Sequence, residues 1–522
     1  MNVADQIRRA VVRFGSRTAA ISGSETRSYL EIDDRSNRLA NALNAAGLAK
    51  GARVATLLEN SIRCVEADFG LAKAGLVRVS LNPMSNSRDV IYMLEDSGAE
   101  AFIYDEKYSA VISEVTNAVT RPVRWIMVQA KEGSGAALAR PQPDRYEDML
   151  AAANPAPHVC PCDGEDLYCL FYTSGTTGRP KGVMLSHRAI LQVGFNLVME
   201  VGPHAPGEKV LLMQPMSHGA GFFVLPWFIK GGISVIMPQF DAEEALRLAR
   251  DLEIETIKLV PTMMQRILNG SSEITGKDLP MLRQIIYGAS PMPIEVLRNG
   301  INRFGPVFVQ IYGQSEAPVT ISILPIEDHE LDGKGAARLA SAGAVWPTVH
   351  LRIVDSNNVE VPAGTPGEVL VRAPQMMSGY WKRPDLTEAT LVDGWLHTKD
   401  LGRMDEKGFL YLLGRLDEMI ISGGYNIAPR EVEDVLYQHP AVREAAVVGE
   451  ADAEWGAAVV AYVVLNGTVE EAEIRDFVKT EIGFKRPKRV YRVSELPKNS
   501  NGKIQKSALK PELALPWEEA VQ

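Results

Sequence analysis

The N-terminal part of the chain alternates between the apolar spacing of helices and that of buried strands. Leucine and isoleucine recur at helical spacing in residues 29–48, an apolar strand pattern follows at 53–60, and a second helical pattern covers 61–75. A further strand pattern at 76–82 and a helix–strand unit at 87–106 repeat this order. Such βαβ order predicts a parallel sheet covered by helices.

The rest of the chain divides into three parts. Alternation of strands and helices returns from Lys209 to Phe308, which predicts a second α/β sheet layer. Between Gly343 and Asp405 strand patterns and Gly/Pro turns dominate, and they predict a small β-barrel-like unit. The segment after Arg415 has its own strand and helix patterns. We therefore expect an α/β protein with a large N-terminal domain at residues 1–415 and a small α+β C-terminal domain at 416–522.

Composition and charge narrow the class of protein. A chain of 522 residues with 46% hydrophobic and 23% charged residues is typical of a soluble protein of several domains. The net charge of −10 disfavours general binding to nucleic acid or anionic membranes. Residues 210–229 lack Asp, Glu, Lys and Arg, but two prolines and two glycines favour a strand, a loop and a helix over a transmembrane segment. The first residues show no signal-peptide pattern, and we expect a cytoplasmic protein.

The strongest chemical signal is YTSGTTGRPKG at residues 172–182. Glycines let a backbone approach a ligand closely, and backbone N–H and hydroxyl groups donate to phosphate oxygens. Arg179 and Lys181 can offset phosphate charge. The spacing differs from the Walker A loop, which needs Gly-Lys-Ser/Thr. The alternative is a surface turn, but apolar strand patterns on both sides favour a phosphate-binding loop.

Further blocks follow this loop in a fixed order, and together they resemble the adenylate-forming superfamily of acyl- and aryl-CoA synthetases, peptide-synthetase adenylation domains and firefly-type luciferases. The resemblance covers essentially the whole chain and is most like bacterial fatty-acyl- or aryl-CoA ligases. The blocks are PMSH (215–218), YGAS (287–290), IYGQSE (311–316), WLHTKD (395–400), GRLDEMIISGGYNI (414–427), KRPKR (485–489) and PKNSNGKIQK (497–506).

The resemblance implies a two-step ligase reaction. A carboxylate and ATP would give acyl-AMP and pyrophosphate, and the thiol of CoA would then give acyl-CoA and AMP. ATP and CoA would be co-substrates and Mg²⁺ the cofactor, with Glu316 as its ligand because hard cations prefer carboxylate oxygen. The C-terminal domain would be mobile and rotate at Asp417 between the two steps.

The resemblance also assigns residues to the nucleotide. Lys503 would bridge the substrate carboxylate and the α-phosphate, and it joins Thr176, His218 and Glu316 as candidate catalytic residues. The candidate ATP- and AMP-binding residues are Thr173, Ser174, Gly175, Thr176, Thr177, Gly178, Lys181, Gly288, Ala289, Ser290, Gln310, Tyr312, Gly313, Ser315, Asp400, Arg415 and Lys503. Three positions depart from the family: Ser315 replaces threonine, Lys399 replaces a glycine before Asp400, and Lys506 replaces arginine.

The acyl and CoA sites follow from the same resemblance. The acyl pocket would include His218, Phe222, Phe223, Gly288 and Ala317. Amino-acid-activating relatives usually carry an aspartate soon after the histidine, whereas this chain has none before Asp241, so a buried substrate ammonium would lack a partner. An apolar fatty, alicyclic or aromatic acid is therefore expected. CoA would contact Gly423, Gly424, Trp455, Phe484, Arg486 and Lys488.

Three functions remain open at this point. The first is an acyl- or aryl-CoA ligase, the second an adenylating enzyme that passes the acyl group to a carrier protein, and the third a non-catalytic nucleotide-binding protein. Retention of Lys503, Glu316 and Asp400 disfavours the third. The expected partners are small molecules, with no nucleic acid, and the sequence leaves a homodimer open.

Overall fold

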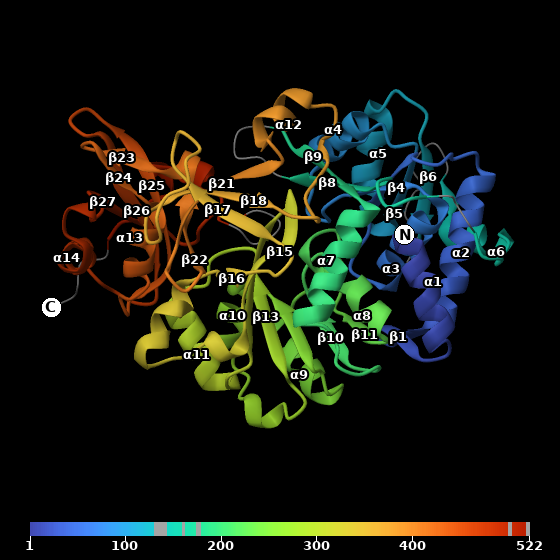
Figure 1. Cartoon of the computed structure of the whole chain (residues 1–522), viewed down its shortest axis with the longest axis horizontal. Coiled ribbons are helices and arrows are strands. Elements are labelled where there is room, and N and C mark those ends of the chain that lie inside the picture. The colour runs from blue at the N-terminus through green and yellow to red at the C-terminus, as the bar shows by residue number, and fades with distance from the viewer. Residues whose placement is uncertain (130–142, 159–161, 174–178, 499–503, 518–522) are drawn as a thin grey trace.

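The structure is a computed structural model that describes residues 1–129, 143–158, 162–173, 179–498 and 504–517. Strands within these ranges form three sheets (Figure 1). Two belong to the large N-terminal part, and the third contains only strands that follow Arg415. The predicted α/β class, with a large N-terminal and a smaller C-terminal domain, is confirmed. The boundary between residues 415 and 416 stays a prediction.

The first sheet is built from the βαβ units of the N-terminal part. Its inner strands pair in parallel, whereas β8 and β9 form an antiparallel hairpin around the predicted phosphate loop. Its order is β19 (Gly379–Tyr380), β9 (Lys181–Ser186), β8 (Leu167–Thr173), β4 (Val77–Ser80), β3 (Arg53–Leu57), β5 (Ala101–Asp105), β6 (Arg124–Val128) and β7 (Asp144–Arg145).

The second sheet joins a parallel half to an antiparallel half. Its path is β17 (His350–Val354), β18 (Gly367–Arg372), β21 (Trp395–Met404), β22 (Phe409–Arg415), β16 (Gly343–Val345), β15 (Ala317–Leu324), β14 (Phe308–Gln314), β13 (Gln284–Gly288), β12 (Thr256–Leu259), β10 (Lys209–Leu212), β11 (Ile233–Ile236), β1 (Thr18–Ser22) and β2 (Glu25–Ser28), with β20 (Leu391–Val392) paired to β21. Because β16 pairs with both β15 and β22, the predicted strand-rich unit continues this sheet.

Helices cover the faces of both sheets and bury most of their apolar side chains against them. None of the helices in the described ranges has the length and apolar character needed to cross a membrane. They are α1 (Val3–Phe14), α2 (Tyr29–Ala45), α3 (Ile62–Ala74), α4 (Ser87–Ser97), α5 (Ser109–Ala118), α6 (Tyr146–Ala152), α7 (His187–Glu200), α8 (Val224–Lys230), α9 (Ala242–Asp251), α10 (Pro261–Leu268), α11 (Ile294–Phe304) and α12 (Pro384–Thr390).

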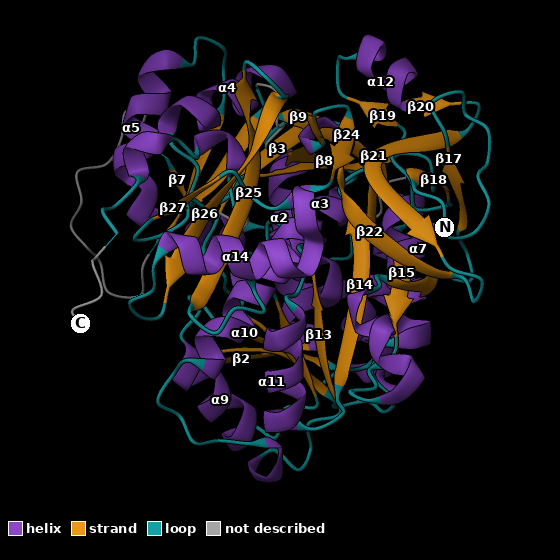
Figure 2. Cartoon of the chain, turned by 90° about the vertical axis from the view of Figure 1, so that its left-hand side faces the viewer, coloured by secondary structure: helices purple, strands orange, loops and turns teal. Residues whose placement is uncertain are grey.

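The C-terminal domain lies at one end of the molecule in Figure 1, and Figure 2 turns that end toward the viewer. Its sheet has the order β24 (Tyr425–Ile427), β23 (Ile420–Ser422), β26 (Gly456–Leu465) and β25 (Val442–Asp452), with β27 (Arg489–Arg492) paired in parallel to β26. Helices α13 (Pro429–Leu436) and α14 (Glu471–Ile482) pack on this sheet and close a core of their own.

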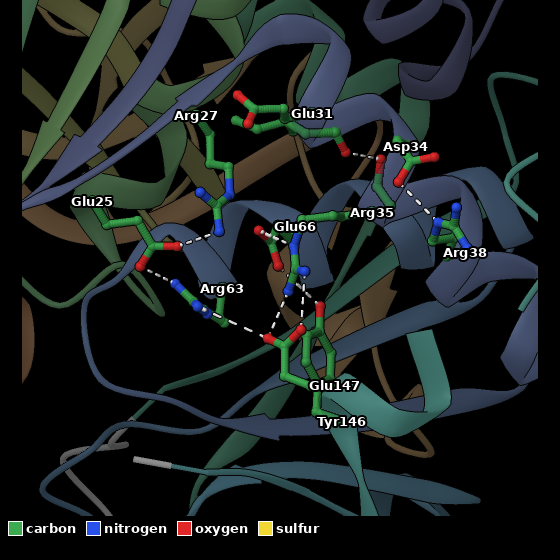
Figure 3. Close-up of polar contacts among 12 residues, drawn as sticks. Glu25, Arg27, Glu31, Asp34, Arg35, Arg38, Arg63, Glu66, Tyr146 and Glu147 are labelled. Atoms are coloured by element: carbon green, nitrogen blue, oxygen red, sulfur yellow. Dashed lines mark hydrogen bonds and ion pairs between the residues drawn. The ribbon is translucent and has the colours of Figure 1, made fainter. Parts of the chain in front are cut away.

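A buried ionic network joins three helices of the first sheet layer (Figure 3). Arg35 of α2 contacts Glu66 of α3 at 2.6 Å and Glu147 of α6 at 2.7 Å. The Glu66 side chain is fully buried, and this burial raises the pKa of its carboxyl group, while Arg35 and Arg63 oppose that rise. Buried carboxylates are costly unless paired, so this network ties α2, α3 and α6 together.

Candidate active site

The candidate site lies where strands of the second sheet reach their carboxyl ends. β13 ends at Gly288 and β14 ends at Gln314, and ligands of α/β sheets bind at this edge. Gly288 pairs with Ile311, and a Cβ atom on Gly288 would lie 2.4 Å from the Ile311 carbonyl oxygen. Only glycine therefore fits beside the β14 backbone at this position.

Tyr312, Asp400 and Arg415 meet at one side of this edge. The Tyr312 hydroxyl donates to Oδ2 of Asp400, while Nη1 of Arg415 donates to Oδ1 at 2.7 Å. Asp400 and Arg415 are paired in the β21–β22 ladder. Burial and the Asp400 charge raise the pKa of Tyr312 well above its ordinary value, so its hydroxyl stays a donor at neutral pH. The three predicted nucleotide ligands thus form one hydrogen-bonded unit.

Lys399, the departure next to Asp400, keeps the backbone geometry that a glycine would favour. Its φ angle is 59°, in the left-handed region that lysine adopts only with strain. Its side chain is exposed, and its N–H donates to Oε1 of Glu368 at 3.0 Å. The lysine therefore keeps the irregular backbone of β21, where the pairing with β18 shifts register, at a cost in backbone energy.

Lys399→Gly is expected to stabilise the protein by about 1 kcal/mol, because glycine adopts the left-handed region without steric strain. Thermal unfolding measures the change. The matched control is Lys407→Gly, at an exposed lysine without positive φ, which should lose stability through backbone entropy. A Lys399→Gly protein that unfolds at or below the wild-type temperature would contradict the backbone strain at this position of β21.

Tyr380 brings the predicted metal ligand and the predicted phosphate-loop lysine together. Its hydroxyl donates to Oε1 of Glu316 at 2.7 Å, and Nζ of Lys181 lies 5.6 Å from the centre of its ring. Tyr380 pairs with Val183 of β9, which holds the ring beside the end of the phosphate hairpin. A carboxylate and an ammonium next to that hairpin are suited to a metal–polyphosphate ligand.

His218 lies in an aromatic setting at the third side of the site. Its ring is 5.2 Å from that of Phe171, and Phe222 packs on the same Phe171 ring. Burial lowers the pKa of His218 to about 4, and the nearby Arg78 charge acts in the same direction. The imidazole is therefore neutral at pH 7. A neutral imidazole agrees with the prediction that His218 borders the acyl pocket, and it does not suit a role that needs a positive charge.

His218 and Phe222 line one small cavity. The neighbouring Ser217 lines a second cavity, and Arg78 lines both. Arg78 pairs with Asp68 at 2.8 Å, and Asp68 also accepts from the Tyr168 hydroxyl at 2.7 Å. The charges here are thus largely matched within the protein.

The remaining predicted nucleotide and acyl residues divide into three groups. Gln310 accepts from the Tyr287 hydroxyl at 3.1 Å, Ala289 has a left-handed φ of 71°, and Phe223 is fully buried. Thr173, Ser290, Gly313, Ser315 and Ala317 lie at the ends of β8, β13, β14 and β15. Ser174, Gly175, Thr176, Thr177, Gly178 and Lys503 lie outside the described residues.

The predicted CoA residues gather on the C-terminal domain. Gly423 and Gly424 are both left-handed, and a Cβ atom on Gly423 would lie 2.4 Å from the Trp455 ring. Nζ of Lys488 lies 4.7 Å from the centre of the same ring. Phe484, in the turn that leads to Arg486, packs on Tyr425 with ring centres 4.7 Å apart. Asp417 lies in the short helix Leu416–Glu418, at the start of this domain.

Sequence reasoning missed Tyr380, Arg78, Asp68 and Tyr168. Tyr380 follows a glycine at the end of a loop, a pattern too short to stand out. Arg78 interrupts an apolar strand pattern and Asp68 a helical one. A charged residue inside an apolar pattern was the available signal, because such residues need a partner when buried.

Comparison with known proteins gives two family matches. The family described as "AMP-binding enzyme" matches residues 7–381, and "AMP-binding enzyme C-terminal domain" matches residues 431–503. A medium/long-chain-fatty-acid–CoA ligase of Mycobacterium tuberculosis is 35% identical, over 94% of this chain and 86% of the relative. A fatty acid–[acyl-carrier-protein] ligase of Streptomyces coeruleorubidus is 34% identical, over 94% and 92%.

Solved structures agree with these relatives. The o-succinylbenzoate CoA synthetase of Bacillus subtilis, in complex with an acyl-adenylate intermediate, superposes with a TM-score of 0.84 at 28% identity. The match covers 97% of each chain. Both domains of the protein are therefore similar to those of ligases that act through an adenylate.

Proposed function

We propose that this chain, which belongs to the AMP-binding enzyme family, joins an apolar carboxylic acid to CoA at the expense of ATP. The reaction would proceed through acyl-AMP with release of pyrophosphate, followed by attack of the CoA thiol with release of AMP. One observation carries the proposal. Tyr312–Asp400–Arg415 and Glu316–Tyr380–Lys181 flank one sheet edge, where they offer hydrogen-bond acceptors for a ribose and paired charges for a polyphosphate.

The residues present fit a magnesium ion that arrives with the nucleotide. Mg²⁺ commonly takes one or two carboxylates together with phosphate oxygens and water. Glu316 offers a half-buried carboxylate, and the Tyr380 hydroxyl donates to its Oε1 atom and not to Oε2. The ion would neutralise phosphate charge during transfer. Lys181 and Arg179, in the β8–β9 hairpin, would contribute further positive charge.

The C-terminal domain supports CoA as the acceptor. Trp455 and Phe484 are 40% and 59% exposed, and Lys488 lies beside the first of these rings. Exposed aromatic rings with neighbouring cations suit a ligand that has an apolar arm and phosphates. The alternative, transfer of the acyl group to a carrier protein, is supported by the similarity to the Streptomyces fatty acid–[acyl-carrier-protein] ligase. Rotation of the domain at Asp417 and a cytoplasmic location belong to the same proposal.

A pyrophosphate-release assay with ATP, Mg²⁺ and a panel of acids tests this function. Fatty acids, cyclohexane carboxylates, benzoates and cinnamates are assayed with and without CoA, with amino acids as the control class. Release that becomes fast only with CoA, together with a thioester of the expected mass, is the expected result. Release that ignores CoA would favour the carrier-protein alternative. Absence of release with every acid would contradict the proposed ligase.

A further inference from the structure

Lys258 is a lysine inside the apolar core beside the candidate acyl pocket. Its side chain is 3% exposed. In the parallel sheet it stands in one row with Leu212 of β10 and Ile286 of β13, and both neighbours belong to the largest hydrophobic core. Its Nζ atom lies 5.8 Å from the centre of the Phe223 ring. The ammonium thus faces the segment that begins at His218.

This ammonium has no counter-charge among the described residues. Nζ donates to the carbonyl of Leu259 at 3.0 Å, and no described carboxylate lies within ion-pair distance. Burial alone lowers the pKa of Lys258 to about 7. Lys73 is buried to a similar degree, but its Nζ reaches Oδ1 of Asp33 at 2.6 Å. This fold therefore pairs one buried lysine and leaves the other without an anion.

A buried amide oxygen without a hydrogen-bond donor lies close to the same segment. Gln214 follows β10 by two residues and is 6% exposed. Its Oε1 atom is buried and accepts no hydrogen bond from a described residue. A Cβ atom on Gly219 would lie 3.8 Å from that oxygen, so the amide points at the residue after His218. Buried polar groups are normally hydrogen-bonded, so an amide oxygen without a donor and an amine without a counter-charge, both beside one segment, call for an outside partner.

The sheet register places Lys258 below the reacting edge. Lys258 pairs with Ile286, and Ile286 precedes Gly288 by two residues on the same strand. Residues two apart on a strand share a face and are separated by about 7 Å. A substrate whose carboxylate lies at the edge would therefore point its far end toward Lys258.

We propose that Lys258 binds an oxygen atom at the far end of the acyl substrate, so that the enzyme acts on acids with an apolar body and a distal oxygen acceptor. The acceptor is a hydroxyl, a ketone or a second carboxylate, each of which can take a hydrogen bond from the ammonium. The apolar body fits the Phe222 and Phe223 segment, and the oxygen supplies the missing partner of Lys258. This inference rests on the proposed ligase function and names its substrate class.

The test uses acids in matched sets with one carbon skeleton. Octanoic acid is compared with 8-hydroxyoctanoic and octanedioic acid, and cyclohexanecarboxylic acid with its 4-oxo and 4-hydroxy derivatives. Pyrophosphate release with ATP, Mg²⁺ and CoA gives kcat/KM for each acid. We expect at least one oxygenated acid to exceed its parent about tenfold or more, since a site built for a polar group rejects the analogue that lacks it.

Lys258→Met then tests the residue, because methionine fills similar space without the ammonium. We expect the ratio of kcat/KM between the oxygenated acid and its parent to fall to about one, through a higher KM for the oxygenated acid. Lys209→Met, at the opposite end of the neighbouring strand β10, should keep the wild-type ratio. Thermal unfolding of Lys258→Met is expected at or above the wild-type temperature, because an unpaired buried charge is removed.

The outcomes separate this inference from the function on which it rests. Pyrophosphate release with parent acids and no preference for oxygenated ones would overturn the inference and leave the ligase standing. An unchanged ratio in Lys258→Met would also overturn it, as would a marked fall in unfolding temperature, which would make Lys258 a structural residue. No release with any acid would overturn both.

Discussion

Lys503→Ala will abolish formation of acyl-AMP while largely sparing thioester formation from supplied acyl-adenylate. The lysine occupies the position in PKNSNGKIQK that, by resemblance, bridges the substrate carboxylate and the α-phosphate. Negative charge shifts between these groups during adenylation only, so its removal affects that step alone. Loss of one such electrostatic contact typically costs about 10²–10³ in rate.

Two half-reaction assays measure this separation. Acid-dependent exchange of pyrophosphate into ATP reports adenylation, and conversion of synthetic acyl-AMP with CoA reports the second step. Lys510→Ala, at an exposed lysine of the same C-terminal segment, is the control and should keep both rates. If Lys503→Ala slows the two half-reactions equally, the lysine does not have the assigned role.

Arg35→Ala is expected to destabilise the protein by about 3–5 kcal/mol, because it leaves the fully buried Glu66 without its direct partner. The Tyr146 hydroxyl also donates to Oε2 of Glu66, but at the long distance of 3.4 Å. The charge of Arg63 acts on the Glu66 carboxylate from a greater distance. Figure 3 shows Arg35 between the two carboxylates of α3 and α6. The unfolding temperature should fall by roughly 3–6 °C, as the unfolding entropy of a domain of this size implies.

The control is Arg247→Ala on α9, whose pairs with Glu244 and Asp251 of the same helix are exposed and should contribute about 1 kcal/mol or less. The double variant Arg35→Ala/Glu66→Leu should recover stability, since it removes the unpaired charge. If Arg35→Ala unfolds at the wild-type temperature, the network does not hold these helices.

The loss in Arg35→Ala should also depend on pH. Burial already raises the pKa of Glu66 in the folded protein, and removal of Arg35 raises it further. The folded state then binds a proton that the unfolded state releases near pH 4.3, so stability falls as pH rises. The destabilisation should therefore grow between pH 5 and pH 8. An equal loss across this range would mean that Glu66 does not carry the effect.

Much of the fold could be predicted because local apolar spacing reports helices and strands directly. The helical pattern at 29–48 is α2, the pattern at 61–75 is α3, and the strand at 167–172 is β8. The extent of the second sheet could not be predicted in this way. The strands that follow residue 350 join the rest of this sheet through the short strand β16, which pairs with β15 and β22, and three residues carry no readable period.

Local patterns were enough to predict the phosphate hairpin, the order of the family blocks and the two-domain α/β class, because these depend on residues close together in the chain. Which distant groups meet depends instead on how the sheets and helices pack. Tyr312 of β14 reaches Asp400 of β21, although these strands are not neighbours in the sheet, and Tyr380 of the first sheet reaches Glu316 beside the second. Burial was likewise decided by packing: Lys73 gains Asp33 from α2, whereas Lys258 faces Phe223 and has no carboxylate partner in the part of the chain that the structure describes.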